Sequence, residues 1–314
     1  MSDQTVAAEA CVALGATDHQ FEPYPGREVA LGALTVTRIL PVKGKRLIGP
    51  WCFLDRFGPS ASAAPTSMDV GSHPHIGLQT VTWLLDGELV HYDSLRNESL
   101  LRPHGVNIMT SGGGIAHAER TPPRHDSRLN GVQLWVALPD CDRRMSASFQ
   151  HLDRVPVLEQ HGGIVQVFAG SLANLSSAAT HYSEIFGGDF QIHPRAAVDV
   201  PLDPRFEHGV IVLGGDCCFE GQPLQERLLY YLGANRSSAS FSSTTGGRLL
   251  VVGGPPFPET ILMWWNFVAR TPAEIADARQ DWEERRRFGD VTTYSGPRLD
   301  APSLVRFAAA NPAS

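Results

Sequence analysis

The chain has little cysteine, no long apolar run and no strongly basic segment. Its five cysteines are scattered over 314 residues without a CxxC pair, which excludes a disulfide framework and a thiolate zinc site. No run of about 18 apolar residues occurs, so we expect no membrane-spanning helix. The formal net charge is -7 and the longest basic run is Arg285-Arg286-Arg287, which argues against direct nucleic-acid binding.

The first 20 residues also lack the pattern of a secretory signal. Met1 to Gln20 contains no basic segment followed by an apolar core. Together with the small number of unpaired cysteines, this predicts a reduced, cytoplasmic protein.

Turn-forming residues are plentiful, with 30 Gly and 23 Pro. They separate short runs rich in Val, Thr, Trp and Phe, a pattern typical of antiparallel β-structure. The runs lie at 34–40, 51–57, 80–85, 106–109 and 132–138, and again at 164–168, 209–213, 228–232 and 249–252. We therefore predict an all-β fold in two halves.

Two dipeptides predict tight hairpins. Asp86-Gly87 lies between the apolar runs 81–85 and 88–90, and Gly214-Gly215 lies between 210–213 and 217–219. Residues that tolerate positive φ favour the two-residue turns of β-hairpins.

One helix is predicted near the C-terminus. Thr271 is a candidate N-cap, Pro272 suits the first helical position, and Glu274 completes a capping box. Gly289 is typical of the residue that follows a helix, so we expect the helix to end near Phe288. The aromatic run 264–267 is interpreted as a core strand that leads into this helix.

These features divide the chain into four parts. We expect an N-terminal arm over 1–28, a first β-domain over 29–150, a second over 151–270, and a C-terminal helix and tail over 271–314. The polar, turn-rich segment 140–156 suits the connection between the two domains.

Two short motifs carry the chemistry. His73-Pro74-His75 and His117-Ala118-Glu119 each place two metal-binding side chains at i and i+2, which share one face of a β-strand. If the two strands are adjacent, three imidazoles and one carboxylate converge, a ligand set that suits Fe, Mn, Ni, Cu or Zn. Spacing alone leaves open whether the pairs meet, and an isolated histidine is more often structural. The histidines without paired spacing are interpreted as structural or solvated: His91, His104, His125, His193 and His208.

A glycine run precedes the second motif. Gly112-Gly113-Gly114 carries no side chains, so the backbone can approach other groups closely. We interpret it as a segment that wraps around the pocket in front of His117, although such triplets are more often plain loops.

The motifs resemble those of the pirin family, a branch of the cupin superfamily. The similar segments cover about residues 30 to 290 and comprise Ser72 to Thr82, Asp86-Gly87-Glu88, His91 to Ser94, Met109 to Glu119, Gly131 to Pro139, Met263 to Val268 and Thr271 to Ala276. The resemblance implies a bicupin, with two antiparallel, jelly-roll-like β-barrels. It also implies one metal, usually iron, held by His73, His75, His117 and Glu119 in the first barrel and no metal in the second.

The chain departs from the family pattern around the first motif. Pirins usually carry Asp and Arg on either side of it, where this chain has Ser72 and Ile76. Gln79 replaces a Glu, and Pro103-His104-Gly105 replaces a Pro-Gly-Asp turn. No ligand is lost, but we expect a changed charge close to the pocket.

The resemblance implies two classes of function. One is a metal-dependent dioxygenase of the quercetin 2,3-dioxygenase type, which opens a flavonol ring with O₂ and releases carbon monoxide. Glu119 would then act as the catalytic base, and Gln133 would line the substrate pocket. The other is a non-enzymatic, redox-sensing regulator that binds a protein partner. The oligomeric state is not predicted.

Overall fold

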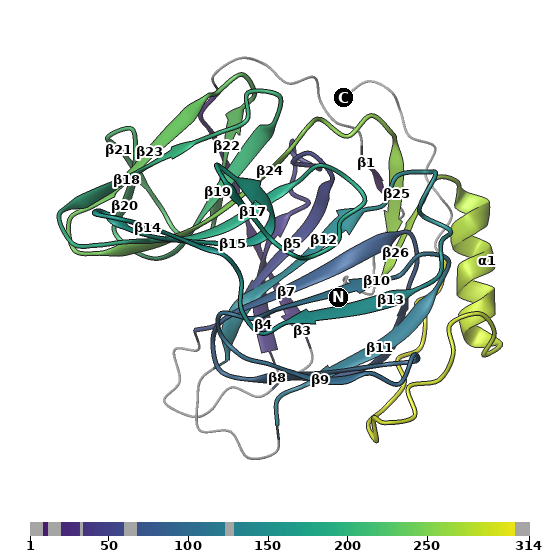
Figure 1. Cartoon of the computed structure of the whole chain (residues 1–314). Coiled ribbons are helices and arrows are strands. Elements are labelled where there is room, and N and C mark those ends of the chain that lie inside the picture. The colour runs from purple at the N-terminus through teal and green to yellow at the C-terminus, as the bar shows by residue number, and fades with distance from the viewer. Residues whose placement is uncertain (1–8, 12–19, 32–33, 60–67, 123–128, 305–314) are drawn as a thin grey trace.

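The computed structural model describes residues 9–11, 20–31, 34–59, 68–122 and 129–304. Almost all regular structure in these residues is β, with one helix near the C-terminus (Figure 1). Every ladder between the strands is antiparallel, for example β7 with β10 and β12. The predicted all-β fold with a short C-terminal helix is confirmed.

The first β unit packs a seven-stranded sheet against a four-stranded one. The large sheet has the order β13-β10-β7-β12-β5-β4-β3: Ser148–Leu152, Val106–Thr110, Leu78–Asp86, Asn130–Ala137, Trp51–Phe57, Leu34–Leu40 and Arg27–Leu31. The small sheet has the order β6-β11-β8-β9: Asp69–His75, Ile115–Arg120, Leu89–Asp93 and Glu98–Leu101.

The second β unit has the same plan. Its large sheet runs β14-β15-β17-β24-β19-β22-β2: Val157–Gln160, Gly163–Leu172, Phe186–Ile192, Gly247–Gly254, Glu207–Gly215, Leu228–Gly233 and Glu22–Pro25, with β16 (Leu175–Ser176) paired to β15. Its small sheet runs β18-β23-β20-β21: Ala196–Pro201, Ser238–Ser243, Cys217–Phe219 and Gln222–Leu224. Strand β2, which precedes the first unit in the chain, therefore belongs to a sheet of the second.

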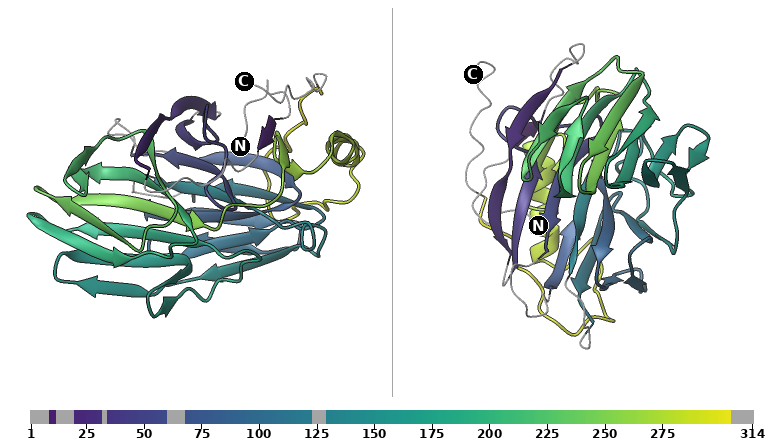
Figure 2. Two further views of the ribbon diagram at one scale, coloured as in Figure 1. Left: turned by 90° about the horizontal axis from the view of Figure 1, so that it is seen from above. Right: turned by 90° about the vertical axis from the view of Figure 1, so that its left-hand side faces the viewer.

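A fifth sheet and the helix lie at the far side of the first unit (Figures 1 and 2). This sheet has three strands, β1 (Glu9–Cys11), β25 (Ile261–Trp264) and β26 (Phe267–Ala269). The aromatic run 264–267 is thus a tight strand-to-strand turn, not a single strand. Helix α1 (Pro272–Glu283) packs on β26, which in turn contacts β6.

Strands β6 to β12 and β18 to β24 follow one pairing scheme. The ladders β6·β11, β8·β11, β7·β10 and β7·β12 have the counterparts β18·β23, β20·β23, β19·β22 and β19·β24. The chain therefore repeats one supersecondary pattern twice, which defines corresponding positions in the two units.

The two hairpin predictions place the turns correctly but the partners wrongly. β7 ends at Asp86 and β8 begins at Leu89, yet these strands belong to different sheets, and so do β19 and β20. Gly87 (φ 88°) and Gly215 (φ 75°) supply the left-handed backbone that a reversal requires. A β-bulge lies beside each turn, at Asn130/Gly131 and at Val212/Gly214, and a bulge bends and twists a strand. The chain therefore turns a corner between sheets.

The largest apolar core lies between the two units. It joins residues from the large sheets of both, including Trp83, Val132, Phe168 and Leu250. The Trp83 and Phe168 rings stack with centroids 5.3 Å apart, and the Trp83 indole N–H donates to the buried Asp189 carboxylate. The interior of the second unit has its own apolar cluster, whereas the interior of the first is shared with polar side chains.

Helix α1 starts as predicted but ends early. Thr271 and Glu274 form the predicted capping box, yet the helix stops at Glu283 with Glu284 as its C-cap, not near Gly289. Instead of continuing, residues 285–288 return toward the first unit, where Phe288 O accepts from Ala116 N and Arg287 Nε donates to Gly113 O. Tertiary hydrogen bonds replace the last predicted turn.

No helix of the described residues is long and apolar enough to cross a membrane.

The hydrogen bonds and ion pairs of Glu274 should make the stability of the protein depend on pH. Burial alone would raise the pKa of its carboxyl, but the Arg270 backbone N–H and the Arg143 and Arg144 guanidinium groups outweigh burial and lower it to about 2. A lowered folded-state pKa adds stability above the ordinary value of 4.5, and this contribution is lost as the pH falls toward about 2. Urea unfolding should show wild type more stable than Glu274→Gln at pH 6, with a gap that shrinks between pH 4.5 and pH 2. A gap that is constant with pH contradicts this origin.

Candidate metal centre

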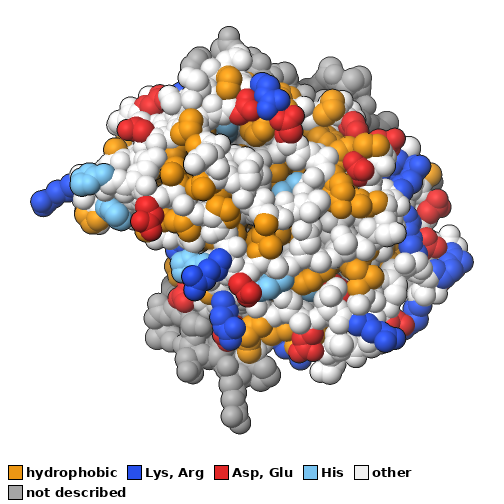
Figure 3. All heavy atoms as spheres, viewed as in Figure 1, with side chains coloured by type: hydrophobic (Ala, Val, Ile, Leu, Met, Phe, Trp, Pro, Cys, Tyr) orange, Lys and Arg blue, Asp and Glu red, His pale blue; other side chains and the backbone are white. Residues whose placement is uncertain are grey.

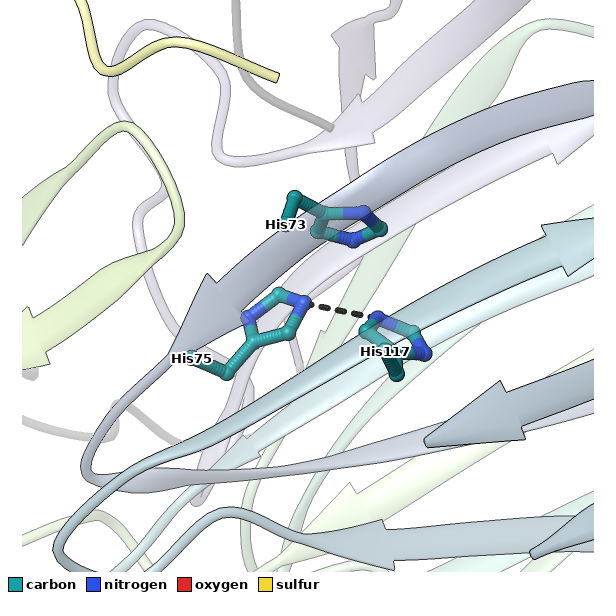
Figure 4. A group of neighbouring side chains, drawn as sticks. All are labelled: His73, His75 and His117. Carbon is teal, nitrogen blue, oxygen red and sulfur yellow. Dashed lines mark hydrogen bonds between the residues drawn. The ribbon is translucent and has the colours of Figure 1, made fainter. Parts of the chain in front are cut away.

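Three histidines from two neighbouring strands converge inside the first unit (Figure 4). His73 and His75 lie two residues apart on β6, and His117 lies on β11 directly opposite His73. One ring nitrogen from each lies within 4.8 Å of the others, and the two Nε2 atoms of His75 and His117 are 3.0 Å apart. All three side chains are at most 2% exposed. The two predicted pairs therefore do meet.

A bulge in β6 shapes this end of the ladder. His117 pairs with His73, but Glu119 pairs with Val70, so Gly71 and Ser72 of β6 lie opposite one residue of β11. Bulges re-aim side chains and occur often beside functional sites. Here the bulge also turns the Gly71 carbonyl toward the site, where it accepts from His73 Nδ1 at 2.8 Å.

Hydrogen bonds to backbone carbonyls fix two of the rings. His73 Nδ1 donates to Gly71 O, and His75 Nδ1 donates at 3.0 Å to Asn266 O in the turn between β25 and β26. A carbonyl can only accept, so each neutral ring carries its hydrogen on Nδ1 and keeps a bare lone pair on Nε2. This is the tautomer that a metal-binding histidine with a second partner adopts.

The three rings are held neutral. Burial, together with neighbouring imidazoles, lowers the pKa of His73 to about 3 and the pKa values of His75 and His117 well below the ordinary value. Two charged rings with nitrogens about 3 Å apart would repel by about 5 kcal/mol at an effective dielectric constant of about 20. Neutral imidazoles with free lone pairs are the form that binds a metal ion.

Glu119 adds a carboxylate at the edge of this cluster. It lies two residues after His117 on β11 and is 6% exposed. One of its oxygens lies within 4.8 Å of ring nitrogens of His117 and His91. Burial raises the pKa of Glu119, and the hydrogen bond from the Thr82 hydroxyl, at 3.4 Å, opposes that shift.

The cluster opens into a very small cavity of about 20 Å³. Its described lining comprises the three histidines with Val36, Asp55, Phe57, Met68, Glu119, Gln133 and Trp135. The predicted pocket residue Gln133 is thus part of the lining and accepts from the Thr82 hydroxyl at 2.8 Å. Asp55 is neutralised by a buried two-pronged ion pair with Arg38, at 2.8 Å for both contacts. Glu119 therefore supplies the one carboxylate of the described lining that lacks a guanidinium partner.

One more histidine, which the sequence alone suggested is structural or solvated, lies beside the cluster. His91 on β8 is 2% exposed, and its Nδ1 lies 3.4 Å from Nδ1 of His117. Its Nε2 lies 3.1 Å from the Asp93 carboxylate. His91 and Asp93 are themselves an i, i+2 pair of polar residues on a strand, which is the signal that could have found them.

Comparison with known families decides what kind of protein this is. The Pirin family profile matches residues 33–136, and the profile of the Pirin C-terminal cupin domain matches residues 188–289. A candidate quercetin 2,3-dioxygenase of Pseudomonas aeruginosa is 40% identical over 289 residues, which cover 91% of each chain. The chain belongs to the pirin family. It is a bicupin of the cupin superfamily.

Other pirins and their structures are similar over most of this pirin. A pirin-like protein of Caulobacter vibrioides is 33% identical over 84% of this chain and 93% of its own length. A crystal structure titled quercetin 2,3-dioxygenase, from Acinetobacter baumannii, is 38% identical with a TM-score of 0.87 and covers 91% of this chain and 96% of that one. Escherichia coli YhhW, solved in complex with nickel(II), shares the fold at 15% identity, with a TM-score of 0.61 and coverage of 76% and 100%.

The departures of this pirin from the family pattern do not line the described cavity. Ser72 binds the C-terminal tail through its backbone, donating to Pro297 O and accepting from Leu299 N. Ile76 packs in the apolar cluster around Phe267. Gln79 donates to Thr110 and to the Thr180 carbonyl, away from the cluster. The residue differences at positions 72, 76 and 79 therefore change the charge outside the described lining of the cavity, and not within it.

The glycine run before His117 lies against the C-terminal segment and a neighbouring loop. A Cβ on Gly112 would lie 2.0 Å from Met145 O, and one on Gly114 would lie 3.1 Å from the Arg287 side chain. None of the three glycines lines the described cavity. The interpretation as a segment wrapped around the pocket does not hold for the described cavity, because the glycines approach Met145 and Arg287, which are not part of its lining.

Apolar residues occupy the corresponding strands of the second unit. The inward residues of β18 and β23, which correspond to β6 and β11, are Val198, Val200, Ala239 and Phe241, each at most 2% exposed. They belong to the apolar core of that unit.

Metal binding by the three histidines can be tested by substitution. His75→Ala and His117→Ala should each lose most bound metal, because each removes one of the three convergent nitrogens that are candidate ligands. Elemental analysis after purification in metal-supplemented medium gives the metal per chain. The matched control is His193→Ala, an exposed histidine of the second unit, which should keep the wild-type content. Equal metal in all four proteins would place the metal elsewhere.

Proposed function

We propose that this pirin is a metal-dependent dioxygenase of the quercetin 2,3-dioxygenase type. The observation that carries the proposal is the set of three buried, neutral imidazoles whose lone pairs converge beside one unpaired carboxylate. The Pseudomonas and Acinetobacter relatives, at 40% and 38% identity, carry the name of that activity. His73, His75, His117 and Glu119 are the proposed ligands.

The donor atoms fit one divalent transition metal. Three nitrogens and one carboxylate oxygen, with no thiolate in the described lining, suit Fe, Mn, Ni, Cu or Zn. Iron is the first choice only because the resemblance to the pirin family implies it. His75 Nε2 is bare and lies 3.0 Å from His117 Nε2, so a hydrogen on His117 Nε2 bridges the two nitrogens in the metal-free site, and a bound cation would take the place of that hydrogen. The three histidines and Glu119 therefore fit the metal ion that the pirin family implies.

Glu119 is the residue suited to accept the flavonol proton. The bound metal lowers the pKa of a coordinated hydroxyl, which favours the deprotonated substrate. Once the substrate displaces Glu119 from the metal, its buried carboxylate is placed to take up the proton, and burial favours the protonated form. Thr82 has one hydroxyl hydrogen and two acceptors, Glu119 at 3.4 Å and Gln133 at 2.8 Å. Thr82 can therefore shift its hydrogen bond to Gln133 when Glu119 takes up the proton.

The size of the cavity sets a condition on this reaction. About 20 Å³ holds an ion or a water, whereas pockets for drug-sized ligands measure about 300–1,000 Å³. Side chains of the lining, such as Phe57 and Met68, must move before a flavonol reaches the histidines.

The small volume of the cavity favours the second function, a metal-containing regulatory protein without turnover. A closed metal site affects a partner through the surface of the protein, not through a bound substrate. On the face shown in Figure 3, acidic and basic side chains are interspersed, so neither sign of charge dominates that face. A partner would then be recognised by shape as much as by net charge.

Turnover separates the two functions. Protein of known metal content is incubated with quercetin in aerated buffer, and quercetin loss is followed by absorbance together with carbon monoxide in the headspace. The dioxygenase releases one carbon monoxide for each quercetin consumed. Glu119→Gln should retain the shape of the site and lower kcat by about 10²- to 10⁴-fold, the usual contribution of a general base.

The absence of turnover is informative only for protein whose metal content has been measured. Metal-loaded wild-type protein that consumes no flavonol with or without reductant contradicts the dioxygenase proposal and supports regulation. Quercetin loss without carbon monoxide, or equal loss with His75→Ala, indicates oxidation by free metal and also contradicts the proposal.

A further inference from the structure

A chain of three buried side chains extends from the metal centre to Asp93 at the end of β8. His117 Nδ1 lies 3.4 Å from His91 Nδ1, and His91 Nε2 lies 3.1 Å from an oxygen of Asp93. The residues His117, His91 and Asp93 are each at most 2% exposed. His117 and His91 come from adjacent strands, with Glu119 opposite His91 in the ladder between β11 and β8.

The contacts determine where the hydrogens lie when a metal is bound. A ligand nitrogen carries no hydrogen, so His117 bound through Nε2 carries its hydrogen on Nδ1. His91 Nδ1 must then accept it, which leaves the hydrogen of neutral His91 on Nε2. That nitrogen faces the Asp93 carboxylate, which accepts. One arrangement of hydrogens satisfies all three groups together.

His91 and Asp93 are held firmly in these positions. The His91 ring stacks on Phe149 with centroids 4.2 Å apart and planes 9° apart. The Asp93 carboxylate also accepts from the backbone N–H groups of Leu95 and Asn97 and from the Asn97 side chain, at 2.8–3.1 Å. A carboxylate with this many donors has little freedom to rotate away from His91.

We propose that His91 and Asp93 are positioning residues of the metal centre, which orient His117 and fix the tautomer that presents its Nε2. The inference rests on the metal site of the proposed function. Backbone carbonyls orient His73 and His75 and fix their tautomers in the same way. His117 is oriented by side chains instead, so its orientation can be changed by substitution.

A competing role for His91 is that of a ligand. His91, His117 and Glu119 also bring three ligand atoms within 4.8 Å of one another. A metal there would use Nδ1 of His117 and would leave His73 and His75 outside its shell. The positioning role uses every observed contact of His91, including the one to Asp93, without dividing the histidines between two sites.

The test measures metal binding by the full chain stripped of metal with a chelator. Co(II) is the probe, because its visible absorption reports affinity, stoichiometry and coordination number in one titration. His91→Phe keeps a ring on Phe149 but removes both nitrogens. We expect one Co(II) per chain in wild type and in the variant, similar spectra, and about 10- to 100-fold weaker binding in the variant.

Two further variants separate positioning from a general structural effect. His91→Asn places a carbonyl oxygen where Nδ1 lies, so it should still accept from His117 and bind Co(II) more tightly than His91→Phe. His151→Phe is the matched control, because His151 also contacts an aspartate, Asp153 at 3.0 Å, but no proposed metal ligand. It should bind Co(II) as wild type does, and thermal unfolding of each metal-free variant reports folding.

Each other outcome overturns a specific claim. Wild type that binds no Co(II) removes the metal site and the role of His91 with it. Wild type that binds one Co(II) while His91→Phe binds it equally well refutes the positioning role and leaves the proposed function intact. A lower coordination number in His91→Phe, or two Co(II) per wild-type chain, makes His91 a ligand. If His91→Phe does not fold, the same comparison is made with His91→Leu, which also removes both nitrogens.

Discussion

The first unit depends on one constraint: a buried neutral imidazole must place its N–H on an acceptor before its other nitrogen is free to bind anything. Leaving that N–H unpaired costs about 1–3 kcal/mol, and the site contains three such rings within a few ångströms. The chain meets the constraint with a bulge carbonyl at Gly71, a turn carbonyl at Asn266 and the side chain of His91. Two of these acceptors lie at irregular points of the backbone, the bulge in β6 and the turn between β25 and β26.

The division of apolar burial between the units makes this polar interior possible. The two large sheets pack on each other and bury Trp51, Trp83 and Phe168 between them, so the largest core lies outside the interior of the first unit. That interior can then accommodate histidines and a carboxylate. The second unit follows the same strand order but fills its interior with Val, Leu and Phe. One topology thus supports a polar centre in one copy and an apolar core in the other.

The sequence was most informative where chemistry depends on neighbours at i and i+2. The period of a strand alone placed His73 with His75 and His117 with Glu119, and the capping box alone placed the start of α1. Turn residues predicted where the chain reverses but not which strand it joins, because Gly87 permits a reversal and does not specify the ladder that follows. The acceptor for His75 could not be predicted, since Asn266 lies 191 residues away and contributes only its backbone. The His91 and Asp93 pair was visible in the sequence, but a lone histidine carries too little information to be separated from a structural one.

The turn between β25 and β26 has a consequence for how the protein matures. Asn266 fixes His75, Trp265 in that turn has a left-handed backbone (φ 51°), and the tail residues Pro297 and Leu299 bind the bulge beside His73. A ribosome delivers these segments only after about 260 residues have been synthesised, whereas both histidine motifs emerge far earlier. The growing chain therefore contains both histidine motifs while it still lacks the Asn266 carbonyl that orders His75 and the tail that binds the β6 bulge. A chain that ends before the turn between β25 and β26 therefore lacks the contact that orients His75 in the described cluster.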